Sequence, residues 1–406
     1  FTAGKASTTG HSNVAIGFEA LLNEDTGRKN VAVGYESLKN QNNNVDNYNT
    51  AVGYQSGVQV NDGVQNVIVG ALAGDALTDG SNNTAVGTFS LTTDDLGSFN
   101  TAIGYNTLSL QNYASATDSY NVAVGGRAGE DVSTGVENTL VGGYAGANLT
   151  DSDYNIAIGY EALLTDNIGS KSIAIGRQAL KLQLFDSSAT DTHNIAMGYQ
   201  AQSQSTIGLE NIAIGSTALF ANTTGRKNIA IGKQALSTFN VTNSANTYNI
   251  AIGSEAGKDL TTGIQNTFVG GLAGDDTDDG NYNTAMGYLA LSANCGDSNV
   301  AIGQEASKVC TGSANTVVGR QAGLALLGGS DNTLMGSEAG STVTTGSNNL
   351  LLGHNAGQSG EPGGSVTTQS NIVALGNSSI TSLNAQVSLT VASDERDKTD
   401  FTDLDR

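Results

Sequence analysis

One five-residue motif, Asn-x-Ala-Ile/Val-Gly, returns along almost the whole 406-residue chain with only small variations. Its glycine, called the unit glycine below, stands at positions 17, 34, 53, 70, 87, 104, 125, 142, 159, 176, 198, 215, 232, 253, 270, 287, 303, 319, 336 and 353. Most steps between these twenty glycines are 17 residues, two are 16, and four are longer, at 19, 21, 22 and 21 residues. A fixed period of this kind is typical of a solenoid, in which each repeat forms one coil of an elongated body. The sequence therefore predicts about twenty coils, with loop insertions at the longer steps.

The motif itself predicts a short β-strand in every coil. Counting from the unit glycine, positions −3 and −1 carry β-branched or aliphatic residues, as in Val14 and Ile16, and such residues favour strands. Because side chains alternate between the faces of a strand, −3 and −1 share one face while −4 and −2 share the other. Position −4 is Asn in nineteen units, with Ser172 the exception. The predicted fold class is all-β, a parallel β-solenoid (β-roll) of 17-residue coils.

Side-chain volumes indicate which face points into the coil. Position −2 is Ala in most units but is larger in six, at Ile68, Leu140, Phe268, Val317, Leu334 and Leu351. Each of these six units has Gly at position +4, whereas the nine units with Leu at +4 all have Ala at −2. Because close packing conserves volume, we expect −2 and +4 to fill one space inside the coil. The Asn at −4 then points inward too, where a stacked amide ladder would satisfy backbone groups of the turn.

The outward face, at −3 and −1, is as apolar as a core. Tyr or Phe often borders it at −5 and +1, as in Tyr154 and Tyr160. A strand that is apolar on both faces is typically buried on both, and an exposed stripe repeated over every coil favours association. We therefore expect this stripe to meet other copies of the chain in a homotrimer, with the polar remainder of each coil exposed.

The charge of the chain excludes some partners. Lys and Arg number 17 against 38 Asp and Glu, which gives a formal net charge of −21. Binding to nucleic acid is not expected, because phosphate neutralisation needs clustered basic residues. Membrane insertion is not expected either, because the sequence has no run of about 18 apolar residues. We also expect no cofactor.

Metal sites and disulfides are weakly indicated. Two Asp-rich segments, Asp275–Asp279 and the pair Asp94 and Asp95, lack the spacing of known calcium-binding loops, so we expect a solvated acidic surface at both, with Ca²⁺ as the alternative. The three His residues lie far apart in the repeat and predict no metal cluster. Cys295 and Cys310 follow their unit glycines by 8 and 7 residues, which places them on adjacent coils. A disulfide and two free thiols are both open, and free thiols are favoured because nothing else resembles a disulfide framework.

The repeated Asn-x-Ala-Ile/Val-Gly-x-x-Ala, from Asn13 to about Gly357, resembles the head repeat of trimeric autotransporter adhesins and of related bacteriophage tail fibres. The resemblance implies that each chain forms a left-handed parallel β-roll and that three rolls pack about one axis. The adhesin repeat is typically shorter than the 17 residues found here, so the loop side of each coil departs from that pattern.

The C-terminal segment resembles a different element. LGNSSITSL…VASDERDKTDF, from Leu375 to Phe401, is similar to the junction that leads into a self-cleaving intramolecular chaperone in phage tail fibres and endosialidases. In that family a Ser before Asp marks the cleavage point and a Lys five residues on assists it, and the matching residues are Ser393, Asp394 and Lys398. A neutral lysine can take the proton of a serine hydroxyl, which is the chemistry that such a pair supplies. The alternative is an acidic disordered tail.

These patterns divide the chain into four parts. Residues 1–357 are expected to form the β-solenoid repeat shaft, and 358–370 a Gly/Ser/Pro linker with the only proline, Pro362. Residues 371–392 are expected to form a terminal β segment, and 393–406 the start of the chaperone-like junction.

The resemblances imply a structural and adhesive fibre protein. The leading interpretation is the shaft of a trimeric bacteriophage tail fibre in the virion, presenting a surface that binds a host glycan or protein receptor and attached to other virion proteins. One alternative is a trimeric autotransporter adhesin at the bacterial cell surface, and another is a polysaccharide depolymerase on a fibre. No enzyme activity is expected in the leading interpretation beyond a single-turnover self-cleavage at Ser393.

Overall fold

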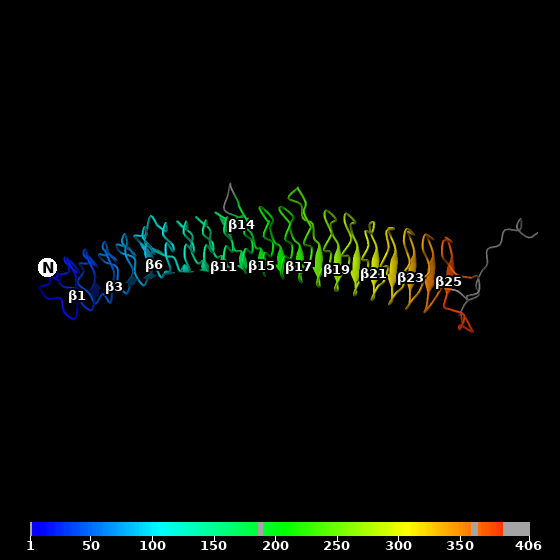
Figure 1. The fold of residues 1–406 in the computed structure, drawn as a ribbon, viewed down its shortest axis with the longest axis horizontal. Coiled ribbons are helices and arrows are strands. Elements are labelled where there is room, and N and C mark those ends of the chain that lie inside the picture. Colours follow the sequence, from blue (N-terminus) through cyan, green and yellow to red (C-terminus); the bar gives the residue numbers. More distant parts are fainter. Residues whose placement is uncertain (1, 186–189, 359–363, 385–406) are drawn as a thin grey trace, which may run out of the picture.

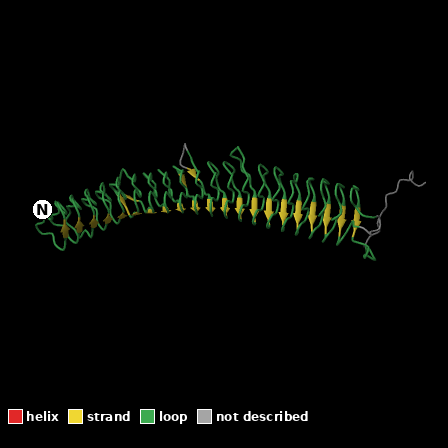
Figure 2. Ribbon diagram, in the orientation of Figure 1, coloured by secondary structure: helices red, strands yellow, loops and turns green. Residues whose placement is uncertain are grey.

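The computed structural model describes residues 2–185, 190–358 and 364–384, and none of these residues is helical. They form one slender, slightly bowed rod of stacked coils (Figure 1). The strands follow one long side of the rod and the loops follow the other, and the strands turn gradually about the long axis from one end to the other (Figure 2). The predicted all-β parallel β-solenoid is thus confirmed.

Twenty-one three-residue strands form one continuous sheet. They are β1 (Val14–Ile16), β2 (Val31–Val33), β3 (Thr50–Val52), β4 (Val67–Val69), β5 (Thr84–Val86), β7 (Thr101–Ile103), β9 (Val122–Val124), β10 (Thr139–Val141), β11 (Ile156–Ile158), β13 (Ile173–Ile175), β15 (Ile195–Met197), β16 (Ile212–Ile214), β17 (Ile229–Ile231), β18 (Ile250–Ile252), β19 (Thr267–Val269), β20 (Thr284–Met286), β21 (Val300–Ile302), β22 (Thr316–Val318), β23 (Thr333–Met335), β24 (Leu350–Leu352) and β25 (Val373–Leu375). In the first twenty, the strand covers positions −3 to −1 of the motif.

Neighbouring strands pair in parallel, and equivalent positions of successive coils face each other. Ala157 of β11 pairs with Leu140 of β10 on one side and with Ala174 of β13 on the other. The same register runs from the first pair, β1 with β2, to the last, β24 with β25. Two insertions add short parallel pairs of their own, β6 (Gly97–Ser98) with β8 (Thr117–Asp118) and β12 (Gly169–Ser170) with β14 (Thr190–Asp191).

The unit glycine is required by the stacking of the coils. At Gly142, φ is +132°, and a Cβ atom would lie 2.6 Å from the carbonyl oxygen of Gly159 in the next coil. A side chain would therefore collide with backbone that has no freedom to move, in a conformation that L-residues rarely adopt. The same close approach recurs along the stack, which explains why this position is glycine in every unit.

The inward face is closed by alanine at −2 and by the Asn ladder at −4. Asn66 is buried, and its Nδ2 donates to the carbonyl oxygen of Gly80 in the turn of its own coil, at 2.9 Å. Its Oδ1 accepts the backbone N–H of Asn83 in the next coil, also at 2.9 Å. In most coils the Asn side chain thus satisfies one turn carbonyl of its own coil and one amide of the next, whereas the Nδ2 atoms of Asn30, Asn100 and Asn283 have no partner. The predicted structural role of the ladder is confirmed.

Positions −2 and +4 share one space, as the volumes predicted. A Cβ atom on Gly274 would lie 2.6 Å from the ring of Phe268, and one on Gly146 would lie 2.7 Å from Leu140. The large side chain at −2 also fills space in the preceding coil, which the sequence did not predict. A Cβ on Gly257, at +4 of that coil, would lie 2.7 Å from Phe268. An enlarged −2 residue therefore needs a small +4 residue in two successive coils.

The sheet continues beyond the last unit glycine. Val366 is buried against the end of the stack, and β25 extends the sheet from β24. Pro362 and most of the expected linker's N-terminal half lie outside the described residues, as do residues 385–392 of the expected terminal segment.

Candidate functional sites

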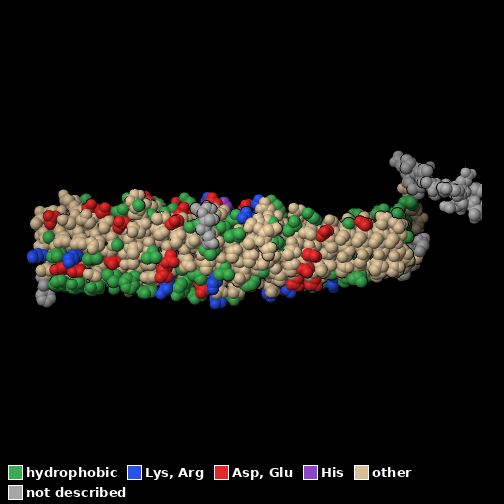
Figure 3. Space-filling model, turned by 90° about the horizontal axis from the view of Figure 1, so that it is seen from above, with side chains coloured by type: hydrophobic (Ala, Val, Ile, Leu, Met, Phe, Trp, Pro, Cys, Tyr) green, Lys and Arg blue, Asp and Glu red, His purple; other side chains and the backbone are tan. Residues whose placement is uncertain are grey.

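The outward face of the strands exposes apolar side chains along the described part of the chain. Within β11, Ala157 at −2 is fully buried, whereas Ile158 at −1 is 37 % exposed. Ile16 of β1 is 60 % exposed, whereas other side chains at −1, such as Ile175 and Ile214, are half-buried. Hydrophobic side chains gather in a row along one long edge of the rod (Figure 3). We call the side chains at −3 and −1 of all coils the outward stripe.

Exposed aromatic residues border the outward stripe. At +1, the rings of Phe18, Tyr35 and Tyr54 stack in sequence, with centroids 5.2 and 5.3 Å apart. At −5, the rings of Phe99 and Tyr120 stack at 5.0 Å. These spacings match the distance between neighbouring strands, so rings on successive coils form short columns along the rod. Tyr or Phe stands at +1 in seven of the twenty units and at −5 in six, so each border is aromatic in only part of the coils.

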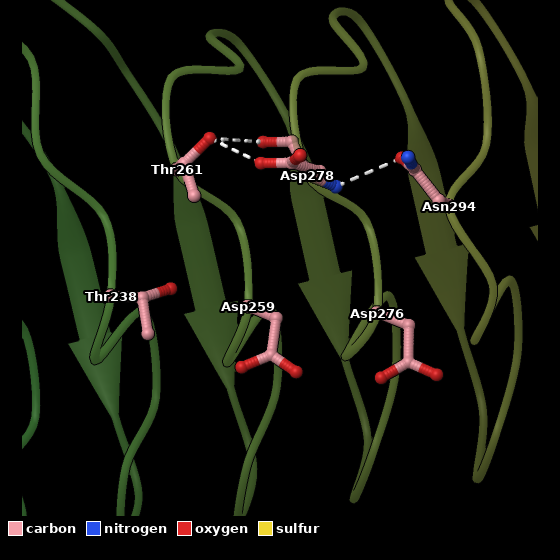
Figure 4. Close-up of a pocket in the computed structure, with 6 residues that line it drawn as sticks. All are labelled: Thr238, Asp259, Thr261, Asp276, Asp278 and Asn294. Atoms are coloured by element: carbon pink, nitrogen blue, oxygen red, sulfur yellow. Dashed lines mark hydrogen bonds between the residues drawn. The ribbon is translucent and has the colours of Figure 1, made fainter.

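An open depression of about 410 Å³ lies on the loop side, and six polar residues from successive coils line it (Figure 4). Thr238, Asp259 and Asp276 form one row; Thr261, Asp278 and Asn294 form the other. Asp278 accepts the hydroxyl of Thr261, and its backbone N–H donates to Asn294 Oδ1 at 3.1 Å. These bonds join adjacent coils and use part of the polar lining.

The acidic loops do not form a metal centre in the described ranges. No group of three or more His, Cys, Asp or Glu side chains within residues 2–185, 190–358 and 364–384 is arranged to hold a metal ion. Beside the depression, burial and the neighbouring charge of Asp276 raise the pKa of Asp275 to about 6. Crowded carboxylates of this kind repel one another, and a lower pH relieves the repulsion.

The two cysteines are buried free thiols on adjacent coils. The Oγ1 of Thr277 lies 3.4 Å from Cys295 Sγ, and Asn315 Nδ2 donates to Cys310 Sγ at 3.6 Å. Burial raises the pKa of both thiols to about 11. Both are therefore protonated at neutral pH and weak nucleophiles.

Sequence reasoning missed two carboxylates inside the coils, Glu24 and Asp166, and was wrong in assigning a third, Asp94, to a solvated surface. Glu24, Asp94 and Asp166 are fully buried, and each stands seven residues after a unit glycine. The signal was present in the sequence, because the next coil carries Gln at the same position in all three cases and then a loop insertion. The carboxylate and the Gln of the next coil recur together only once in every four coils. A comparison of each coil with a single 17-residue repeat therefore does not reveal them.

The residues expected at the self-cleavage junction, Ser393, Asp394 and Lys398, lie outside the described residues. No helix in the described part of the chain is long and apolar enough to cross a membrane. No protein-family model matches the chain, and no curated protein matches it either.

Proposed function

We propose that the chain is the shaft of a trimeric fibre of the bacteriophage tail-fibre type, which holds a receptor-binding surface away from the particle. The observation that carries the proposal is the outward stripe, which recurs in every coil and has no partner within the described part of the chain. A rod of twenty-one strands spaced about 4.8 Å apart is on the order of 100 Å long. Such a rod holds the structures at its two ends apart and does not enclose a substrate.

The stripe favours association of identical chains. Burial of apolar surface contributes about 25 cal/mol per Å², and a stripe repeated over every coil sums this contribution along the rod. Three parallel chains about one axis bury the stripe in closed symmetry. In that arrangement, the aromatic side chains at −5 of one chain contact those at +1 of the neighbouring chain. Equivalent coils then lie at the same height.

Chemical cross-linking tests the parallel arrangement. An Ile214→Cys variant, in the background of the two buried thiols, should be joined between chains by a short bis-maleimide, because the three copies of this residue face one axis. A matched Thr134→Cys variant, on an exposed loop, should not be joined under the same conditions. Absence of cross-links at Ile214, and also at Ile158 and Ile252, would overturn the parallel trimer.

The loop side is the surface left for a receptor in this arrangement. It is polar and acidic, and four insertions interrupt it, all of them before Gly253. A host glycan or surface protein is the partner class that the fibre resemblance implies. Binding of fluorescently labelled fibre to candidate host cells, compared with a fibre in which the loops of one block are shortened, tests whether these loops contact the receptor.

The C-terminal junction supports the phage interpretation over a cell-surface adhesin. We expect a longer form of the chain, which continues into a chaperone, to be cleaved at Ser393 after assembly. A Ser393→Ala variant of that longer form should keep its chaperone, and mass spectrometry of the purified fibre reports this. If the variant is trimmed to the same mass as the unmodified protein, Ser393 is not the cleavage residue.

A further inference from the structure

The two borders of the outward stripe carry charged residues as well as rings. At the −5 border, the Lys, Asp and Glu residues are Lys29, Glu137, Lys171, Glu210, Lys227 and Asp331. At the other border, positions +1 and +2 together carry the Lys and Arg residues Arg127, Arg177, Lys233 and Arg320 and the Glu residues Glu19, Glu36, Glu161, Glu255, Glu305 and Glu338. Figure 3 shows charged side chains on the long edge that also carries the row of hydrophobic side chains. The charges therefore flank the surface that the proposed trimer buries.

Two acidic residues of the −5 border are free. Glu137 and Asp331 are exposed, and the side chain of neither makes an ion pair or hydrogen bond in the described part of the chain. At the opposite border, the side chains of Arg127 and Arg320 are 44 % and 53 % exposed, although each also pairs with a Glu of its own chain. Charges that remain available beside an apolar surface are typical of an interface rim, where they select the partner and the register.

Charges at the two borders cannot meet within one chain. The strand and its flanking residues separate −5 from +1, and about 3.3 Å per residue makes this distance on the order of 15–20 Å. In the proposed trimer, the three strands of one level form the sides of a triangle, so the −5 end of each strand lies beside the +1 end of the neighbouring chain. Charge complementarity between the two borders therefore reports on contacts between copies.

The charges favour one way of joining the borders. In the preceding-coil register, −5 of one chain meets +1 and +2 of the preceding coil of its neighbour. This register brings together four attractive pairs and no repulsive pair: Lys29 with Glu19, Glu137 with Arg127, Lys171 with Glu161, and Asp331 with Arg320. The two other charged residues at −5, Glu210 and Lys227, then face uncharged residues.

The two neighbouring registers fit the charges less well. Joining coils of the same number gives one attractive pair, Lys29 with Glu36, and three repulsive pairs: Lys171 with Arg177, Lys227 with Lys233, and Asp331 with Glu338. Joining −5 to the following coil gives two attractive pairs, Glu210 with Lys233 and Lys227 with Glu255, and one repulsive pair, Glu137 with Glu161. Contacts between like charges disfavour an arrangement. The rings do not discriminate, because Tyr154 would meet Tyr144 in the preceding-coil register and Tyr160 in the same-coil register.

The preceding-coil register agrees with the path of the solenoid. Each coil climbs by one strand spacing, about 4.8 Å, toward the C-terminal end of the rod. A strand that climbs at about 14° over about 20 Å lifts its +1 end by one such spacing, to the level of −5 in the next coil. Equivalent coils of the three chains still lie at the same height, as the threefold symmetry requires.

We propose that charge pairs between −5 of each coil and +1 or +2 of the preceding coil in the neighbouring chain set the register of the trimer. This inference rests on the proposed function, and the partner is a second copy of the chain. Exposed ion pairs contribute little stability, so the pairs act on orientation while the outward stripe supplies the affinity. Glu137 and Asp331 are the best probes, because Lys29 and Lys171 are also bound by acidic residues of their own chain.

Paired cysteines test the register at Glu137. Glu137→Cys is combined with Arg127→Cys, Tyr144→Cys or Glu161→Cys, which change +2 of the preceding, the same and the following coil. A disulfide needs Cα atoms within about 7 Å, so the pair with Arg127→Cys should form covalent trimers at least about tenfold faster than the other two. Non-reducing denaturing gels measure these rates. The exposed positions leave the core of the coils unchanged.

The second free acid gives an independent repeat at +1. Asp331→Cys is combined with Arg320→Cys, Ser337→Cys or His354→Cys, and the pair with Arg320→Cys should react fastest. Faster cross-linking of a same-coil or following-coil pair at either place would overturn the proposal. The mass of the unmodified chain separates the two possible failures. A trimer that is not joined through Arg127 or Arg320 contradicts the register alone, whereas a monomer contradicts the proposed function and the register together.

A double-mutant cycle tests whether the charges are the cause. At low ionic strength, Glu137→Arg and Arg127→Glu should each lower the unfolding temperature of the trimer. Together they should lower it by less than the sum, because the pair is restored with reversed signs. Added salt should reduce this coupling. Additive effects of the two changes would contradict a charge pair at this contact.

Discussion

Both faces of the long sheet carry apolar side chains, but the faces differ in what covers them. In β16, Ala213 faces inward and is fully buried by its own chain, whereas Ile212 and Ile214 face outward and keep part of their surface exposed. The inward face is completed by the Asn ladder and by the residue at +4. The outward face has no counterpart in the described part of the chain. Apolar side chains alone therefore do not identify the core face of a strand. The core face is identified by a second position, here +4, whose side-chain volume compensates for that at −2.

The largest expected effect comes from a charge on the outward face. Ile214→Asp places three carboxylates together at the proposed trimer axis, where burial and like charge both oppose ionisation. We expect loss of the trimer at neutral pH, measured as a threefold fall in mass. Asp151→Ala is the control, since this side chain contacts only Ser133 and Thr134 hydroxyls on the exposed side. An Ile214→Asp variant that keeps the full trimer mass would show that the face is solvated.

A cut in the Asn ladder should give the next largest effect. Asn138→Ala leaves the carbonyl oxygen of Ser152 and the N–H of Asn155 without their partners at 2.8 and 3.0 Å. Two buried unsatisfied groups cost about 2–5 kcal/mol together. Urea unfolding at fixed protein concentration measures this loss. Thr134→Ala, which removes an exposed hydroxyl contact, should change stability by less than about 0.5 kcal/mol. Equal effects from the two changes would argue against a structural ladder.

The smallest effect concerns the space shared by −2 and +4. Ala213→Leu should overpack its coil and cost about 1–3 kcal/mol. Adding Leu219→Gly should restore much of the loss, because Leu219 sits at φ +51°, where glycine is unstrained. Adding Gln202→Gly as a third change, at +4 of the preceding coil, should restore a further part of the lost stability. Additive destabilisation in the double variant would mean that the two positions do not touch.

Much of this fold follows from the repeat read with elementary rules. The alternation in Asn-x-Ala-Ile-Gly located each strand, and the exchange of Leu140 with Gly146 identified the inward face. The need for glycine at each unit was harder to see, since it arises from the approach of the next coil's carbonyl oxygen rather than from a turn. The exception at Ser172 also has a hydrogen-bond partner. Its hydroxyl accepts from Gln183 Nε2 in the same coil at 2.9 Å.

The candidate sites were less predictable for physical reasons. The buried carboxylates Glu24, Asp94 and Asp166 sit at +7, which is apolar in some coils and polar in others, so a single coil gives no warning of a buried charge. Their partners appear only when successive coils are stacked: a Gln of the next coil donates to Asp94 and Asp166, and Asn47 donates to Glu24. The junction around Ser393 rests on resemblance, and its residues lie outside the described part of the chain.

The mass of the unmodified chain in solution tests the central claim most directly. Multi-angle light scattering coupled to size exclusion reports mass independently of shape, which matters for a rod. The outward stripe predicts one species at three times the 41.2 kDa of a single chain, unchanged on dilution. A stable, soluble monomer would contradict the trimer and, with it, the conclusion that the outward stripe is an interface between chains.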